Sequence, residues 1–155
     1  MTKHRTLKGY PQAEAITNEE LFALDVDILV PAAIDGVITR DNMKNIKAKI
    51  ISEGANGPIS SEAQQYLESQ GVTIIPDILA NAGGVIVSYF EWVQGLQQFF
   101  WNEKEVNEKL AEIMARAFHR VADNSEKYKC GLKTSALITS VERLSHAMLL
   151  RGLFP

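Results

Sequence analysis

The chain has 155 residues, which is long enough to bury the core of one domain. Its composition, 46% hydrophobic and 23% charged, is ordinary for a soluble globular protein. A net charge of −3 without a long basic run argues against a nucleic-acid partner held through its phosphates.

Residues 78–100 form the longest nearly uncharged stretch, and this length raises the question of a membrane span. Asn81, two glycines, Glu91 and several glutamines interrupt the stretch, so we expect a buried helix of a soluble protein and no membrane partner. The N-terminus lacks the apolar core of a secretory signal. A single cysteine, Cys130, suits a reducing compartment, and we expect a cytoplasmic protein.

The first half of the chain alternates short apolar runs with helical segments. After an extended segment at residues 1–16, a capping box from Thr17 to Glu20 opens a short helix through about Leu24. Short apolar runs predict three parallel strands, at residues 26–30, 49–52 and 72–75, and the first, rich in β-branched residues, is expected to be buried. Helices are expected between them, at residues 41–46 and 61–71, the second one capped by Ser61 with Gln64. This rhythm of right-handed βαβ crossovers predicts an α/β fold with a partial, Rossmann-like parallel sheet of about three strands.

The second half of the chain predicts helices only. Residues 76–101 read PDILANAGGVIVSYFEWVQGLQQFFW, and from Val85 onward apolar residues recur at helical spacing. We expect that helix to be buried on most sides. A cap at residues 102–105 then opens a long amphipathic helix that Gly131 ends, and Thr134 or Ser135 starts the last helix.

Small residues and two asparagines follow the predicted strands. In a parallel α/β sheet, ligands bind beyond the carboxyl ends of the strands. Asn56 follows the second strand and Asn81 the third, and an amide suits a carboxamide or ribose hydroxyls. Taken singly, Asn56 would be a turn residue and Asn81 a helix cap, but their joint placement favours a site.

Ser88 lies inside the apolar helical run, where a hydroxyl needs a hydrogen-bond partner. That partner is a backbone carbonyl one turn back, a neighbouring side chain or a ligand. Glu53 precedes the turn that holds Asn56, and a structural role there is favoured over that of a catalytic acid. The three histidines have no metal-ligand spacing, so no metal site is expected.

Three ordered motifs resemble the glutamate dehydrogenase branch of the Glu/Leu/Phe/Val dehydrogenase family. They are ILVPAA at residues 28–33, SEGANGP at 52–58 and PDILANAGGVIVSYFEWVQ at 76–94, and the ending SVERLSHAMLLRG at 140–152 looks like that family's last helix. The resemblance implies the C-terminal part of an NAD(P)-binding domain. Residues 1–101 would form its βαβ half-domain and motif helix, and residues 102–155 its C-terminal helices.

The resemblance also implies roles for particular residues. By position in the motifs, Asn56 and Asn81 would line the nicotinamide and its ribose, with Ala32 close to the cofactor. Val85 would pack on the substrate, and Ser88 would bind the distal carboxylate of glutamate. The implied cofactor is NAD or NADP, the substrate pair is glutamate and 2-oxoglutarate, and a homo-oligomer is expected.

Parts of the family's machinery have no counterpart in this sequence. It contains no G-x-G-x-x-G turn, and it lacks the family's catalytic lysine and aspartate, so no catalytic residue is expected in this chain. The sequence therefore predicts a fragment of an NAD(P)-dependent glutamate dehydrogenase. Two alternatives stay open: an inactive remnant or interaction module, and a branched-chain or aromatic amino-acid dehydrogenase. The resemblance favours glutamate over the latter, because those sibling families tend to carry A-N-N-Q where this sequence has A-N-G-P at residues 55–58, and an apolar residue where Ser88 stands.

Overall fold

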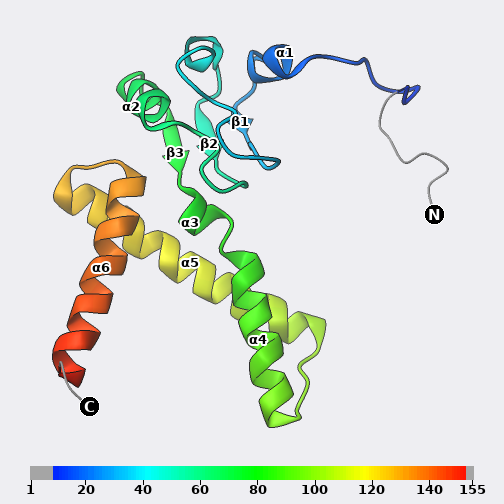
Figure 1. The fold of residues 1–155 in the computed structure, drawn as a ribbon. Coiled ribbons are helices and arrows are strands. Elements are labelled where there is room, and N and C mark those ends of the chain that lie inside the picture. The colour runs from blue at the N-terminus through cyan, green and yellow to red at the C-terminus, as the bar shows by residue number, and fades with distance from the viewer. Residues whose placement is uncertain (1–8, 153–155) are drawn as a thin grey trace.

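The computed structural model describes residues 9–152 and shows an α/β fold, as predicted (Figure 1). Three parallel strands form one sheet in the order β1-β2-β3, with bounds Ile28–Leu29, Ile50–Ser52 and Thr73–Ile75. The helices are α1 (Asn18–Phe22), the 3-10 helix η1 (Met43–Asn45), α2 (Ser61–Ser69), α3 (Asp77–Ala80), α4 (Gly83–Gln97), α5 (Glu103–Tyr128) and α6 (Leu132–Arg151). Residues 1–8 of the predicted N-terminal segment lie outside the described residues.

The main core lies on one face of the sheet. Ile51 in the central strand is fully buried, and Ile74 beside it in β3 is nearly so. Both pack with Ala63 and Leu67, which α2 presents one turn apart. The sheet thus has one well-packed side, built from the segments between residues 22 and 74.

The prediction of a buried first strand was wrong. Ile28 is 57% exposed and Val30 56% exposed, whereas Leu29 between them packs against the core. Side chains alternate between the two faces of a strand, so only Leu29 points to the covered side. Because β1 also lies at the edge of the sheet, no other strand in the described part of the chain pairs with its outer side.

Local capping signals located the starts of several helices. The Thr17 capping box is present: Glu20 N donates to Thr17 Oγ1 at 3.2 Å, and Thr17 N donates to Glu20 Oε2 at 2.7 Å. The predicted cap of α2 was one residue off, because Ser60 rather than Ser61 accepts from the backbone, and Gln64 donates to Glu68 instead.

The apolar stretch from residue 76 splits into two helices, α3 and α4, with a break at residues 81–82. The prediction that α4 is buried on most sides was wrong. Only Phe90 and Gln94 are buried, while the predicted stripe is exposed: Val85, Tyr89, Trp92, Leu96 and Phe99. At about 100° per residue, Phe90 lies almost opposite Trp92, and it packs on Trp101 with ring centroids 5.5 Å apart. The helix therefore buries one narrow face, toward α5.

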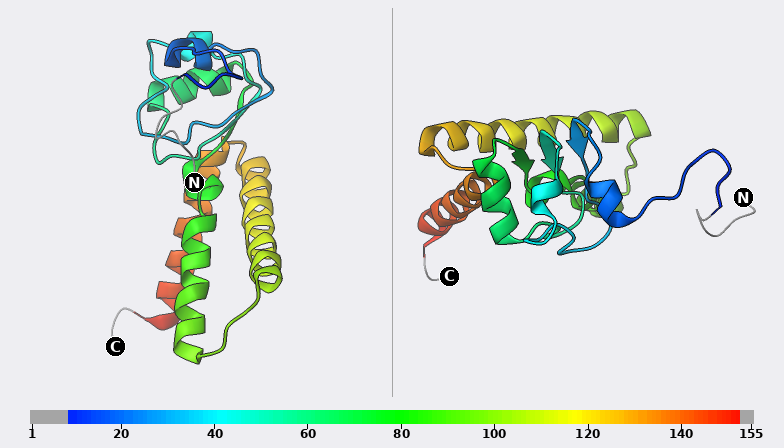
Figure 2. Two further views of the ribbon diagram at one scale, coloured as in Figure 1. Left: turned by 90° about the vertical axis from the view of Figure 1, so that its right-hand side faces the viewer. Right: turned by 90° about the horizontal axis from the view of Figure 1, so that it is seen from above.

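The two long helices α5 and α6 pack against each other near their connection. Asn102 caps α5 with Glu105, as predicted. The chain leaves α5 through Lys129 at φ +53°, so Gly131 is not its stop but the residue before α6, which begins at Leu132, earlier than predicted. The left view of Figure 2 shows α4, α5 and α6 gathered beyond one end of the sheet. Among residues 9–152, no helix is long and apolar enough to cross a membrane.

Candidate functional site

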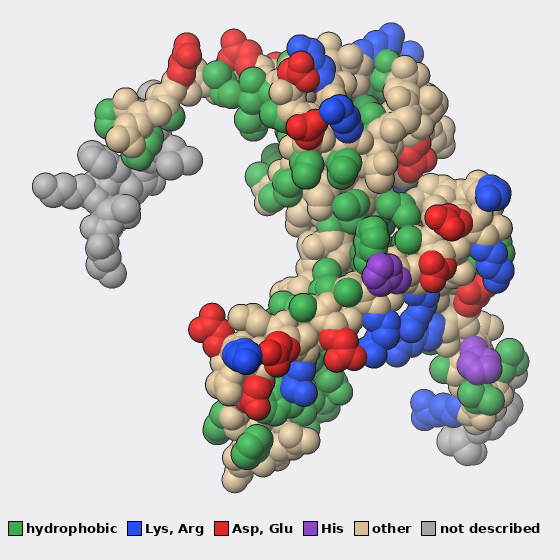
Figure 3. Space-filling view, turned by 180° about the vertical axis from the view of Figure 1, so that it is seen from behind, with side chains coloured by type: hydrophobic (Ala, Val, Ile, Leu, Met, Phe, Trp, Pro, Cys, Tyr) green, Lys and Arg blue, Asp and Glu red, His purple; other side chains and the backbone are tan. Residues whose placement is uncertain are grey.

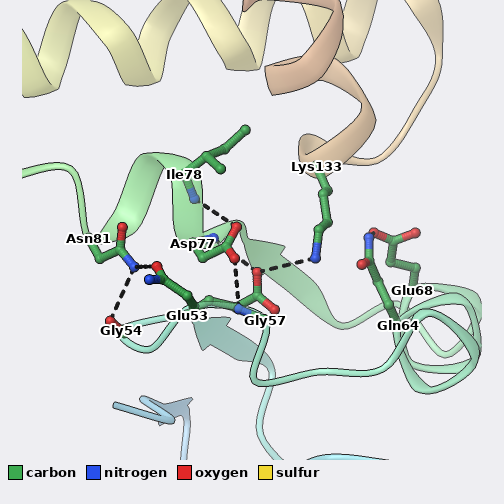
Figure 4. A network of polar contacts seen from close by, with 10 residues as sticks. Glu53, Gly54, Gly57, Gln64, Glu68, Asp77, Ile78, Asn81 and Lys133 are labelled. Carbon is green, nitrogen blue, oxygen red and sulfur yellow. Dashed lines mark hydrogen bonds and ion pairs between the residues drawn. The ribbon is translucent and has the colours of Figure 1, made fainter. Parts of the chain in front are cut away.

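The two candidate asparagines meet at the carboxyl end of the sheet. Asn81 Nδ2 donates to Asn56 Oδ1 at 2.7 Å and also approaches the Gly54 carbonyl at 3.3 Å (Figure 4). Asn56 stands in the turn after β2, and Asn81 ends α3, the short helix after β3. The expectation that both amides share one rim holds, and the contact between them is direct.

Ala32 borders the same rim, in the turn after β1. A Cβ built on Gly54 would lie 2.8 Å from the Ala32 Cβ, which is closer than real side chains approach. Ala55 N donates to the Pro31 carbonyl at 2.9 Å and joins the two turns. The small residues therefore allow the turns after β1 and β2 to pack closely, with Ala32 still exposed.

Val85 and Ser88 lie on α4 and share one face of it. Val85 is 70% exposed, in the first turn after the break that follows Asn81. Ser88 Oγ donates to the Gly84 carbonyl at 3.0 Å, which is the backbone partner considered above. The hydroxyl must rotate away from Gly84 before it can donate to a ligand.

Glu53 is a buried carboxylate behind the rim, with none of its surface exposed. Its Oε2 accepts from the Asp77 backbone N at 2.9 Å and lies 3.8 Å from Lys133 Nζ (Figure 4). Burial raises the pKa of the Glu53 carboxyl above its usual range, and the Asp77 N–H and the Lys133 charge act in the opposite direction. These contacts fit the structural role favoured from the sequence.

Asp77 connects the rim to α3. Its Oδ2 accepts from Gly57 N at 2.8 Å, and its Oδ1 accepts from Ile78 N at 2.8 Å. Gly57 adopts φ +56°, a backbone conformation that favours glycine, so the turn presents its N–H to Asp77 without strain. Sequence reasoning missed Asp77 and Lys133. Only Asp77 had a local signal, as an acid that opens a helix after a proline.

The surface is hollowed between the body that holds the sheet and the lobe that holds α4, as the space-filling view shows (Figure 3). Among residues 9–152, no group of three or more histidine, cysteine, aspartate or glutamate side chains could hold a metal ion.

Residues 1–152 match the family model described as Glutamate/Leucine/Phenylalanine/Valine dehydrogenase. The chain belongs to this dehydrogenase family. Glutamate dehydrogenase from Thermotoga maritima is 51% identical over 153 residues, which are 99% of this chain and 37% of that protein. NAD-specific glutamate dehydrogenase from Staphylococcus aureus is 50% identical over 139 residues, 90% of this chain and 34% of the relative.

Solved dehydrogenase structures share the fold. Hetero-hexameric glutamate dehydrogenase from Thermus thermophilus, in a leucine-bound form, superimposes with a TM-score of 0.87 at 36% identity, covering 93% of this chain and 35% of the other. The chain thus spans about a third of the length of the curated relatives it matches.

Proposed function

We propose that the chain is the C-terminal part of an NAD(P)-dependent glutamate dehydrogenase. The intact enzyme would oxidise L-glutamate to 2-oxoglutarate and ammonium by hydride transfer to the nicotinamide ring. The observation that carries this proposal is the Asn56–Asn81 amide pair at the carboxyl edge of the sheet, in a chain of this family. Residues 1–101 would form the half-domain with the motif helix, and residues 102–155 the C-terminal helices.

The amide pair fits a nicotinamide carboxamide or its ribose. In their mutual contact Asn81 uses Nδ2 and Asn56 uses Oδ1. Asn56 Nδ2 and Asn81 Oδ1 make no hydrogen bond with any of the described residues. One donor and one acceptor therefore remain for a ligand. A carboxamide needs this complementary pair. Because Gly54 has no Cβ to collide with Ala32, the turns after β1 and β2 pack closely beside the amide pair.

Each site residue then has a role in binding. Asn56 and Asn81 would orient the nicotinamide and its ribose, with Ala32 packed close to the cofactor. Val85 would pack on the substrate, and Ser88 would bind the distal carboxylate of glutamate. NAD or NADP, when bound, supplies the hydride acceptor, and the residues of this chain position the ring and help to exclude water. One relative is named NAD-specific, which supports a nicotinamide cofactor without choosing between the two for this chain.

The whole protein would be a homo-oligomer with glutamate and 2-oxoglutarate as its small-molecule partners. A hexameric relative supports assembly. The apolar face of α4 and the open β1 edge favour a second candidate, in which this chain alone is an inactive remnant or interaction module. A cytoplasmic location stays a prediction.

The two halves of the cofactor test the proposal. Nicotinamide mononucleotide, titrated into the isotope-labelled chain, is expected to shift the NMR signals of the Asn56 and Asn81 side-chain amides. Adenosine monophosphate is the matched control, because it carries a nucleotide phosphate without the carboxamide. Equal effects of the two mononucleotides, or none from either, would contradict a nicotinamide site at this rim.

A further inference from the structure

The polar contacts of the rim continue into the interior of the protein and end on α6 (Figure 4). Two short segments, residues 53–57 and 77–81, face each other across the carboxyl end of the sheet. Four hydrogen bonds join them: Asp77 N to Glu53, Gly57 N to Asp77, and Asn81 Nδ2 to both Asn56 and Gly54. The candidate amide pair is one end of this set, and Glu53 is the other.

The Glu53 carboxylate fixes the start of α3. It accepts from the backbone N–H of Asp77, the first residue of that helix. The helix is only one turn long, and Asn81 N donates back to the Asp77 carbonyl at 3.0 Å. A shift of Asp77 is therefore transmitted directly to Asn81, because so short a helix has no other turn to absorb it.

Lys133 occupies a position near the N-terminus of α6 that is unfavourable for a cation in an isolated helix. It is the second residue of α6, near the positive end of the helix dipole, where a cation is unfavourable. The Glu53 carboxylate, 3.8 Å away, provides the opposite charge that this position needs. Glu53 has no exposed surface and the Lys133 side chain is 30% exposed, so water screens this pair less than it screens an ion pair on the surface.

The first turn of α6 is itself held in place. A Cβ built on Gly131 would lie 2.6 Å from Glu68 Oε1, so the chain just before α6 packs directly against the side chain of Glu68 in α2. Gln64 Nε2 donates to the same oxygen at 3.0 Å and fixes it. Lys133 therefore extends toward Glu53 from an anchored base.

We propose that Glu53, paired with Lys133, is a positioning residue that holds the Asn56 and Asn81 amides in the geometry that receives the nicotinamide carboxamide. The proposal rests on the proposed function, because it assigns the network to a cofactor rim. The Glu53–Lys133 contact also makes α6 part of that rim, although α6 carries none of the candidate ligand contacts.

The test compares the chain with two variants, Glu53→Gln and Lys133→Met. Matched controls are Glu112→Gln and Lys104→Met, which each remove one partner of an exposed ion pair within α5. Two readouts are taken, namely the NMR signals of the Asn56 and Asn81 side-chain amides, and the dissociation constant of nicotinamide mononucleotide. We expect both rim variants to move the amide signals and to weaken binding about three- to tenfold, the effect of one misplaced hydrogen bond, whereas the controls change neither.

A third readout separates positioning from stability. In the wild-type chain, the Asn81 amide signal is expected to change with pH as Glu53 ionises, and Glu53→Gln removes that titration. If both rim variants lower only the unfolding midpoint and leave the amide signals unchanged, the proposal is overturned. If Glu53→Gln does not fold, Lys133→Met decides, because its side chain is partly exposed. If the rim variants move the amide signals but nicotinamide mononucleotide does not bind the wild type, the positioning role is upheld and the proposed function is refuted. If the mononucleotide binds the wild type and both rim variants equally well, the proposed function is upheld and the positioning role is refuted.

Discussion

Ser88 has a backbone partner in the structure and a proposed ligand in the intact enzyme. Restoring the upstream sequence and changing Ser88→Val is expected to lower kcat/KM for glutamate about ten- to a hundredfold, since a hydrogen bond to a charged group contributes roughly 1.5–3 kcal/mol. Discrimination against norvaline should relax, because the polar group that disfavours it is gone. Steady-state kinetics with both amino acids on one preparation measures this.

A matched control exists on α6, where Ser140 Oγ donates to the Ala136 carbonyl one turn back, just as Ser88 donates to Gly84. Ser140→Val removes the same type of helix contact on α6, a helix that carries none of the proposed ligand contacts. If Ser88→Val leaves the glutamate-to-norvaline ratio where Ser140→Val leaves it, Ser88 is only a helix hydroxyl.

Glu53 makes folding stability depend on pH. Its pKa in the folded chain is raised, chiefly by burial, above the ordinary value of 4.5. A group of this kind contributes its full stability below the unfolded pKa and loses it as pH rises through the folded pKa. The free energy of unfolding of the wild type, relative to Glu53→Gln, should therefore fall as pH rises above 4.5. Urea titrations of both proteins at several pH values check the sign; a difference that grows with pH would contradict it.

Sequence could predict the two rim asparagines but not the network behind them. Asn56 and Asn81 each follow a strand, and parallel strands bring their carboxyl ends together, so the placement needs only local patterns. Glu53 and Asp77 are 24 residues apart, and Lys133 belongs to a different helix again. The spacing of apolar residues along the sequence cannot predict these contacts, because they depend on how α3 and α6 pack in three dimensions.

At the scale of elements, α4 shows what a helical repeat does not reveal. The spacing correctly placed Val85, Tyr89, Trp92 and Leu96 on one face of α4, whereas Phe99 lies beyond the end of the helix. The spacing does not predict whether another element covers that face. In the described structure, no element covers the stripe from Val85 to Phe99. Burial lies on the opposite side, where Phe90 meets Trp101.

Two phenylalanines of this region provide a direct comparison. Phe90 is 5% exposed and Phe99 is 66% exposed. Phe90→Ala is expected to cost about 3 kcal/mol of unfolding free energy, because it empties a packed position. Phe99→Ala should stay within about 0.5 kcal/mol, as exposed substitutions do. Chemical denaturation of both variants measures the difference, and equal losses would show that the stripe is covered in solution.

At the scale of the whole molecule, the chain has several surfaces open to association. No strand among residues 9–152 pairs with the outer edge of β1, Ile28 and Val30 are more than half exposed, and the stripe on α4 adds apolar area. We expect the mass measured by light scattering to rise with concentration, because open edges and apolar faces both favour pairing with another copy.

Charged substitutions show which surface is responsible. Ile28→Lys on the β1 edge should reduce the association, whereas Ile16→Lys, at an isoleucine that is 47% exposed and lies outside the strand, should not. A clean monomer at high concentration would contradict the open-edge argument.

The isolated chain is expected to form no NAD(P)H from glutamate. Its sequence has no G-x-G-x-x-G turn and no counterpart of the family's catalytic lysine and aspartate. The absorbance of NAD(P)H in the presence of purified chain, glutamate and either cofactor measures this. Turnover that persists after rigorous removal of host enzymes would refute the expectation.

The close packing of Gly54 on Ala32 limits which substitutions this rim can accept. A Cβ at residue 54 would lie 2.8 Å from the Ala32 Cβ, so a methyl group at residue 54 requires its loss at residue 32. While residue 32 is alanine, residue 54 therefore has no room for a side chain. The turns after β1 and β2 are therefore coupled sterically: while residue 32 keeps its methyl group, even a methyl group added at residue 54 forces the two turns apart.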